Sequence, residues 1–146
     1  MLKKTIEYED WNGKTRTEDF YFNLTRPEIA ELEYGLGPGK SLTGSIQDLI
    51  DAKDFGAVLA TTKELILKSY GVKSDDGRRF VKNQEIRDSF EQNPAYDILY
   101  MELATNAESL ADFIAGLMPK SMLNSLGPNP KATILDKLNT TDLQLN

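Results

Sequence analysis

Residues 3–22, with the sequence KKTIEYEDWNGKTRTEDFYF, decide the fold class because they predict strands at the start of an otherwise helical chain. Ile6 and Tyr8 alternate with polar residues, as in a strand with one buried face, and an aromatic run closes the second half. Asn12 and Gly13 favour a tight hairpin turn, because both tolerate the positive φ that its central residues need. We therefore expect a β-hairpin over residues 3–22.

Helical patterns fill the chain from residue 25 to residue 118. Apolar side chains recur there every three or four positions, the spacing that places them on one face of a helix. Residues with capping chemistry precede the apolar runs, namely Thr25 with Glu28, Asp54, Asn83, Pro94, and Thr105 with Glu108. A weaker helix is expected at 41–52, where Gly44 costs stability. The helix after Asp54 should end at Gly71, which suits a C-terminal cap.

A second, very short hairpin interrupts the helices. Residues 74–77, SDDG, predict a turn, and the run 78–81 that follows is expected to pair with Val72 and Lys73 before it. Together the patterns predict an α+β, mainly α, fold. It consists of an N-terminal β-hairpin followed by a bundle of about five to six short helices.

The last part of the chain has a different character. Residues 127–130, GPNP, cannot hold regular structure, and residues 139–146 are polar with scattered leucines. A chain of 146 residues has the size of one domain and can bury a core without disulfides or metals. We expect residues 1–118 to form a single globular domain and residues 119–146 to be a flexible, disordered C-terminal tail.

The composition narrows the classes of function. The 17 lysines and arginines against 23 aspartates and glutamates give a formal net charge of −6, and a surface of that sign repels nucleic-acid phosphates and anionic lipids. No apolar run approaches the length of a membrane span, and none follows the N-terminus as in a signal peptide. We therefore expect an intracellular protein that binds neither nucleic acid nor membranes.

The chain lacks two of the residue types that catalysis most often uses. Cysteine and histidine are both absent, which removes thiolate nucleophiles, the commonest zinc sites and the usual general base near neutral pH. Residues 35–41, GLGPGKS, have the glycines, lysine and serine of a phosphate-binding loop, but Pro38 removes an amide and no parallel strand precedes them. We expect no enzyme activity, no cofactor and no metal. A carboxylate-based hydrolase would need a concave site with strongly perturbed acids.

Negative charge is concentrated between residues 83 and 112. This segment holds seven acidic residues, and Arg87 is its one base. Two interpretations follow from this asymmetry. The acidic side chains keep a helical surface soluble, or they steer a basic, apolar helical client onto that face.

Several local strings resemble the tail assembly chaperones of long-tailed (siphovirus-type) phages that infect Gram-positive bacteria. The strings are YEDWNG at 8–13, EDFYFNLT at 18–25, DGRRFV at 76–81, AY at 95–96, MELAT at 101–105, ADFI at 111–114 and MP at 118–119. The resemblance covers roughly residues 2–119 and leaves the tail unmatched. No catalytic motif is among the strings, so they indicate a family rather than a site.

The resemblance implies a protein of the host cytoplasm that is absent from the mature virion. It would bind the tape-measure protein, a very long and partly apolar helical chain, and keep it soluble while tail-tube subunits are recruited. Such chaperones are often made in a short form and a frameshift-extended form, whose extension engages the tail-tube protein, and this chain is similar to the short form. Self-association along the client would add avidity. The alternative is a structural tail-completion or connector subunit of the virion.

Aromatic residues are the candidates for contact with a protein partner. On the C-terminal helices these are Tyr96, Tyr100 and Phe113, and Trp11 beside the hairpin turn is a fourth. Each also has a simpler interpretation. The three helical residues fall on stripes that a small bundle must bury, and Trp11 can cover the hairpin. Their burial in the folded chain distinguishes a contact residue from a core residue.

Overall fold

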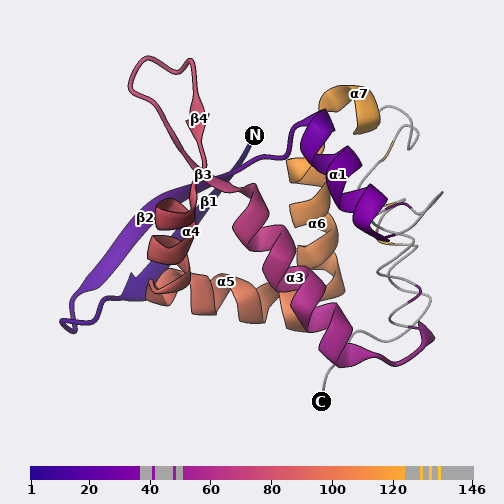
Figure 1. Ribbon diagram of the computed structural model, residues 1–146. Helices are drawn as coiled ribbons and strands as arrows, with labels where there is room; N and C mark the ends of the chain where they lie inside the picture. The colour runs from indigo at the N-terminus through magenta and orange to yellow at the C-terminus, as the bar shows by residue number, and fades with distance from the viewer. Residues whose placement is uncertain are drawn as a thin grey trace.

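The computed structural model describes residues 1–36, 41, 48, 51–123, 129, 132 and 135 (Figure 1). Its elements are, in chain order, β1 Leu2–Glu9, β2 Thr15–Phe22, α1 Arg26–Leu36, α3 Phe55–Ser69, β3 Tyr70–Lys73, β4 Phe80–Val81, α4 Gln84–Glu91, α5 Pro94–Thr105, α6 Ala107–Leu117 and α7 Lys120–Leu123. The predicted α+β, mainly α, fold with an N-terminal hairpin is therefore confirmed.

Strands β1 and β2 form the predicted hairpin over their full length. They pair antiparallel from Leu2 opposite Phe22 to Glu9 opposite Thr15. One face of the hairpin is buried, because even-numbered side chains point to the helices and odd-numbered ones to solvent. The buried apolar side chains of this face are Ile6, Tyr8, Phe20 and Phe22.

The turn between β1 and β2 differs from the primed type that the sequence suggested. Only Gly13 has a positive φ, of 78°, and its N–H donates to the carbonyl of Asp10 at 2.9 Å. The Asp10 carboxylate also accepts from the backbone N–H groups of Asn12 and Lys14, at 2.9 Å each. These bonds hold a wider loop in which Asn12 needs no left-handed conformation.

Two more strands extend the sheet, in the order β1-β2-β3-β4. The predicted short hairpin is confirmed, with Val72 opposite Val81 and Lys73 opposite Phe80. The sequence did not indicate that β3 also pairs with the end of β2, through two opposed residue pairs. Figure 1 shows the β1–β2 and β3–β4 hairpins projecting from the helices in different directions.

Gly71 does not end the central helix as predicted. Helix α3 stops at Ser69, and Tyr70 is already extended, with a φ of −69° and a ψ of 139°. Gly71 belongs to β3 instead, where the ring of Phe80 lies against its Cα. A Cβ at this position would stand 2.7 Å from Phe80 Cε2. The glycine is therefore required by close packing rather than by a left-handed cap.

Three predicted helix starts have the expected capping bonds, and a fourth has the expected proline. Thr25 and Glu28 form the reciprocal capping box at the start of α1, with bonds of 3.0 and 3.3 Å. Asp54 caps α3 and Asn83 caps α4, each accepting from the backbone N–H three residues on. Pro94 occupies the first turn of α5.

The cap of α6 is one residue later than predicted. Asn106 accepts from the N–H of Ser109 at 3.0 Å, whereas Thr105 is still the last residue of α5. The Thr105 hydroxyl donates to the carbonyl of Met101 at 2.6 Å, one turn back. Thr105 is thus engaged by the preceding helix, and Asn106 takes the place of the predicted cap.

Aromatic rings fill the centre of the core. Phe22 meets Phe90 and Phe113 at centroid distances of 5.7 and 5.2 Å, and Phe90 stacks on Tyr70 at 4.3 Å. Aliphatic side chains of α3, α5 and α6 surround these rings. The hairpin and the helices therefore share one core, with α5 and α6 packed against β1.

Two predictions fall largely on residues that the structure does not describe. Of the expected helix 41–52, residues 42–47, 49 and 50 lie outside the described residues. The expected tail 119–146 begins with the short helix α7, and Leu135 is half-buried against the core. Most of the remaining tail residues lie outside the described ones.

Candidate partner-binding surface

Helix α5 is held at its start and along one face. Asn93 accepts from the backbone N–H of Ala95 at 2.9 Å, and Pro94 costs no helical bond in the first turn. The inward residues Leu99 and Leu103 are buried, and the helix packs against β1, α3, α4 and α6. The position of α5 is therefore fixed, and its outward residues keep a constant place on the surface.

Tyr96 and Tyr100, two of the predicted contact residues, are half-buried at the border of the core. Tyr96 lies edge-on to Phe90, and both Phe90 and Tyr100 are 5.8 Å from it between ring centroids. The Tyr100 hydroxyl donates to the carbonyl of Leu59 at 3.4 Å, which ties α5 to α3. Burial, then the Glu91 carboxylate and Tyr100, raise the pKa of Tyr96 to about 12. Both rings thus join elements of the fold and face solvent only in part.

Trp11, the predicted contact on the hairpin, is 82% exposed. Its indole N–H donates to the carbonyl of Gln92 at 3.1 Å, between α4 and α5. The bond fixes the ring although most of its surface faces solvent. An exposed aromatic ring with a fixed position loses little conformational entropy when a partner covers it.

Phe113, the fourth predicted contact residue, is 2% exposed. Its ring meets Phe22 edge-on, with 88° between the ring planes. A side chain at this depth presents no surface to a partner. The simpler interpretation from the sequence, a core residue on the buried stripe of α6, matches this position.

Two other apolar residues of α5 are exposed. Ile98 is 43% exposed and Met101 is 51% exposed, and the exposed carboxylates of Asp97 and Glu102 lie on the same side of the helix. We call these four residues the α5 ridge. It combines an apolar pair with negative charge on a rigid element, which suits contact with an apolar helix that carries basic residues.

The sequence contained a signal for the α5 ridge. Tyr96, Leu99 and Leu103 form one helical stripe, and Ile98 and Met101 fall outside it. A surface helix normally keeps its outward side polar. Apolar residues outside the buried stripe are therefore better candidates for exposure than the largest rings within it.

Folding brings basic residues to the acidic segment 83–112. Lys4 of β1 lies 3.5 Å from Glu102, and Lys63 of α3 lies 3.1 Å from Glu91, between charged atoms. These side chains are partly exposed, so the ion pairs add little to stability. They do reduce the local excess of negative charge that the sequence suggested.

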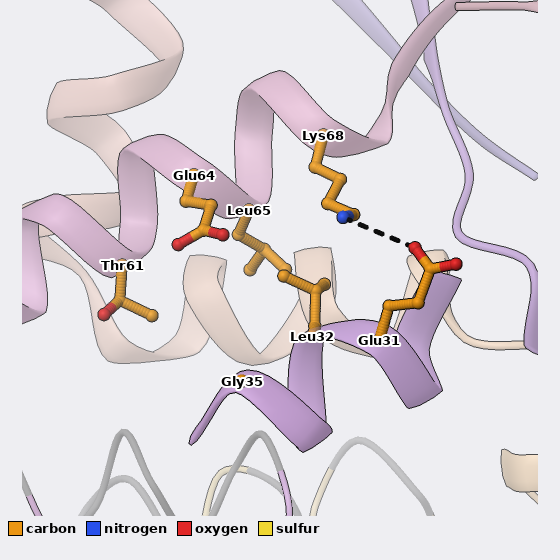
Figure 2. A pocket seen from close by; sticks show the side chains of 7 residues that line it. All are labelled: Glu31, Leu32, Gly35, Thr61, Glu64, Leu65 and Lys68. Carbon is orange, nitrogen blue, oxygen red and sulfur yellow. Dashed lines mark ion pairs between the residues drawn. The ribbon is translucent and has the colours of Figure 1, made fainter. Parts of the chain in front are cut away.

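A small hollow of about 150 Å³ lies between α1 and α3 (Figure 2). Leu32 of α1 and Leu65 of α3 point toward each other, and Lys68 reaches toward Glu31, with 3.9 Å between the charged atoms. Its size is below that of typical sites for organic ligands. An apolar contact beside an ion pair is what the docking of one helix on another requires, and we assign the hollow to that contact.

The described residues do not gather the groups that acid–base or metal chemistry needs. Asp10, Glu28 and Asp76 have lowered pKa values and lie in three separate parts of the fold, whereas a carboxylic general acid needs a raised pKa. Among the residues that the structure describes, no group of three or more acidic residues is placed to hold a metal ion. No described helix is long and apolar enough to cross a membrane.

Comparison with protein families gives a match over almost the whole sequence. The model of a family described as phage tail assembly chaperone matches residues 1–145. No curated protein and no solved structure matches the chain. The family match includes both hairpins and every helix described above. The chain therefore belongs to the phage tail assembly chaperone family.

Proposed function

We propose that this chain binds the tape-measure protein of its phage, keeps it soluble in the host cytoplasm and helps to recruit tail-tube subunits. Membership of the family supports a non-enzymatic role in tail assembly through protein partners. The resemblance of the local sequence strings supports the tape-measure protein as the client. In this proposal the chain is released before the virion matures, and an extended form carries the contact with the tail tube.

The α5 ridge is the observation that carries the proposal. Ile98 and Met101 offer an apolar surface to a helical stripe of the client, and the exposed carboxylate of Asp97 attracts basic residues beside that stripe. Glu102 contributes less, because Lys4 lies 3.5 Å from its carboxylate. Trp11 offers a second exposed anchor on the hairpin. Each contact is modest, so binding several copies along one long client would supply the avidity that holding it in solution requires.

Co-expression with the tape-measure protein from the same phage tests the proposal. We expect the tape-measure protein to stay in the soluble fraction and to copurify with this chain. The double variant Ile98→Lys with Met101→Lys should lose the complex, because it replaces the apolar pair with charge. Tyr34→Lys is the matched control, since Tyr34 is 87% exposed on α1, away from the α5 ridge.

Two results would count against this function. A tape-measure protein that is equally soluble without this chain does not need it as a chaperone. Detection of the chain in purified tails by mass spectrometry, in amounts comparable to the tail proteins, would favour the alternative of a structural tail-completion or connector subunit.

A further inference from the structure

Strands β2 and β3 separate after a short contact and leave a fork in the sheet. They pair only through Tyr21 opposite Gly71 and Phe22 opposite Tyr70. Beyond these pairs β3 turns away to join β4 (Figure 1). Among the described elements, the edge of β2 from Thr15 to Asp19 therefore has no strand beside it on the side away from β1, and its side chains are exposed.

The backbone groups on this open edge can be identified from the pattern of hydrogen bonds. Asp10 N–H donates to Lys14 at 2.8 Å across the hairpin, and Asn23 N–H donates to Ser69 at 2.9 Å on the other side of β2. Because the bonds of an antiparallel ladder alternate, even-numbered residues of β2 bond toward β1 and odd-numbered ones away from it. The N–H and C=O groups that face the open edge are those of Thr15, Thr17 and Asp19.

A groove of about 420 Å³ continues this edge into the fork. Phe20, Tyr70 and Val72 give it an apolar lining, and Val72 is among the exposed large apolar residues of the chain. A strand added to β2 would direct alternate side chains to opposite faces of the sheet. Every second side chain of such a strand would enter the groove, as in peptide recognition by strand addition.

The charges around the groove favour a basic occupant. Glu18 and Asp19 are among its lining residues, against the single basic residue Lys73. Their carboxylates accept hydrogen bonds from the hydroxyls of Tyr8 and Thr5 on β1. Lys73 already lies 4.1 Å from the centre of the Tyr21 ring, on the outer face. The nearby Arg16 is bonded to Asp10 at 2.6 Å and is thereby held toward the turn. Hydroxyl donors leave a carboxylate charged, and Arg16 acts on Glu18 less strongly than on Asp10. A lysine or arginine of a partner would therefore meet an excess of negative charge here.

We propose that the open edge of β2 and the adjoining groove bind an extended, basic segment of a partner protein as an additional strand. Its backbone bonds to Thr15, Thr17 and Asp19, one apolar side chain occupies the groove, and a neighbouring basic side chain meets Glu18 or Asp19. The site involves β2 and β3 rather than the α5 ridge, so it does not depend on the client proposed above.

The first test uses the full chain labelled with ¹⁵N and an extended decapeptide that alternates valine with lysine. We expect the peptide to slow hydrogen exchange at the amides of Thr15, Thr17 and Asp19. The amides of Glu7 and Glu9, on the opposite edge of the hairpin, should be unchanged. A helix-forming peptide of alanine and lysine with the same charge is the control for electrostatic attraction alone, and it should protect none of these amides.

The second test compares two proline variants of the same residue pair. Thr17 lies opposite Glu7, and by the alternation above both N–H groups point outward, to opposite edges. Thr17→Pro and Glu7→Pro therefore each remove an edge donor without removing a bond between β1 and β2. We expect Thr17→Pro to weaken peptide binding about tenfold and Glu7→Pro to leave it unchanged. Matched thermal unfolding curves of the two variants would show that the β1–β2 hairpin remains folded in each. Asp19→Asn removes a negative charge without changing the backbone of the edge, and it should also weaken binding of the basic peptide.

Three outcomes would overturn the proposal. Equal protection of the amides on both edges, or an equal loss of peptide binding in the two proline variants, would mean that the peptide does not bind β2 specifically. Binding of the helical control to the same amides would reduce the site to charge attraction. Protection of these amides that rises with protein concentration in the absence of peptide would identify a second copy of this chain as the occupant.

Discussion

Glu28 is a single side chain that connects three parts of the fold. Lys82 Nζ donates to its two carboxylate oxygens at 2.9 and 2.7 Å and to the carbonyl of Asn23 at 2.6 Å. Burial disfavours the charged form of Glu28, but hydrogen bonds from Lys82 and Thr25 outweigh it, so its pKa lies below the ordinary 4.5. A lowered pKa means that this stabilisation is present above about pH 4.5 and is lost as the pH falls through the folded-state pKa.

We predict that Glu28→Gln is less stable than the natural chain at neutral pH and that the difference shrinks as the solution becomes acidic. Thermal unfolding followed by circular dichroism between about pH 3 and pH 7 measures it. Glu7→Gln, at an exposed position of β1, is the control. A difference that stays constant over this range would show that the charge of Glu28 is not what stabilises the contact.

At the scale of single elements, the cap of α6 is a different residue from the one that the sequence predicted. Asn106→Ala should destabilise the protein by about 1 kcal/mol, because it leaves the N–H of Ser109 without its cap. Thr105→Ala should cost less, since the Thr105 hydroxyl bonds to the carbonyl of Met101 within α5 and does not cap α6 through Ser109. Urea unfolding of the two variants compares the costs, and the reverse order would restore Thr105 as the cap.

The contact between β3 and β4 depends on the absence of a side chain at Gly71. Gly71→Ala should destabilise the protein by about 1–3 kcal/mol, because the added methyl group would overlap the ring of Phe80. Gly35→Ala is a matched control in α1, where an added Cβ meets no atom within 4 Å. Equal stability of the two variants, measured by urea unfolding, would show that Phe80 moves aside at little cost.

At the scale of the whole molecule, the aromatic core joins the hairpin to the helices. Phe90→Ala should cost about 3–5 kcal/mol, because the ring stacks on Tyr70 and meets Phe22 inside the core. Trp11→Ala should cost about 1 kcal/mol or less, since the ring is mostly exposed and loses one hydrogen bond. Chemical unfolding checks both, and a comparable loss in Trp11→Ala would assign the indole to the core.

The distribution of charge over the whole molecule also depends on folding. The sequence places one base among the acidic residues of 83–112, but Lys4 and Lys63 reach that segment from β1 and α3. The packing of distant elements therefore determines which acidic side chains of this segment are available to a partner. The same holds for the candidate contact residues, because Phe113 is buried and Ile98 is exposed.

The sequence by itself determined the local structure of this protein. The two hairpins, the capping box of α1 and the caps Asp54 and Asn83 follow from interactions among residues a few positions apart, and these act in any fold that contains them. The family could also be identified at this level, because local strings carry it. The turn at Asp10 was located correctly, although the bonds to its carboxylate gave it a different conformation.

The tertiary structure alone decided which of these elements meet and which side chains remain exposed. The pairing of β3 with β2 joins residues far apart in the chain, and the exposure of Ile98 and Met101 depends on which side of α5 the distant elements cover. Local propensity acts only on neighbours, whereas strand pairing and burial depend on how the whole apolar surface is covered. The open edge of β2 exists for the same reason, since no strand of the described part of the chain packs beside it.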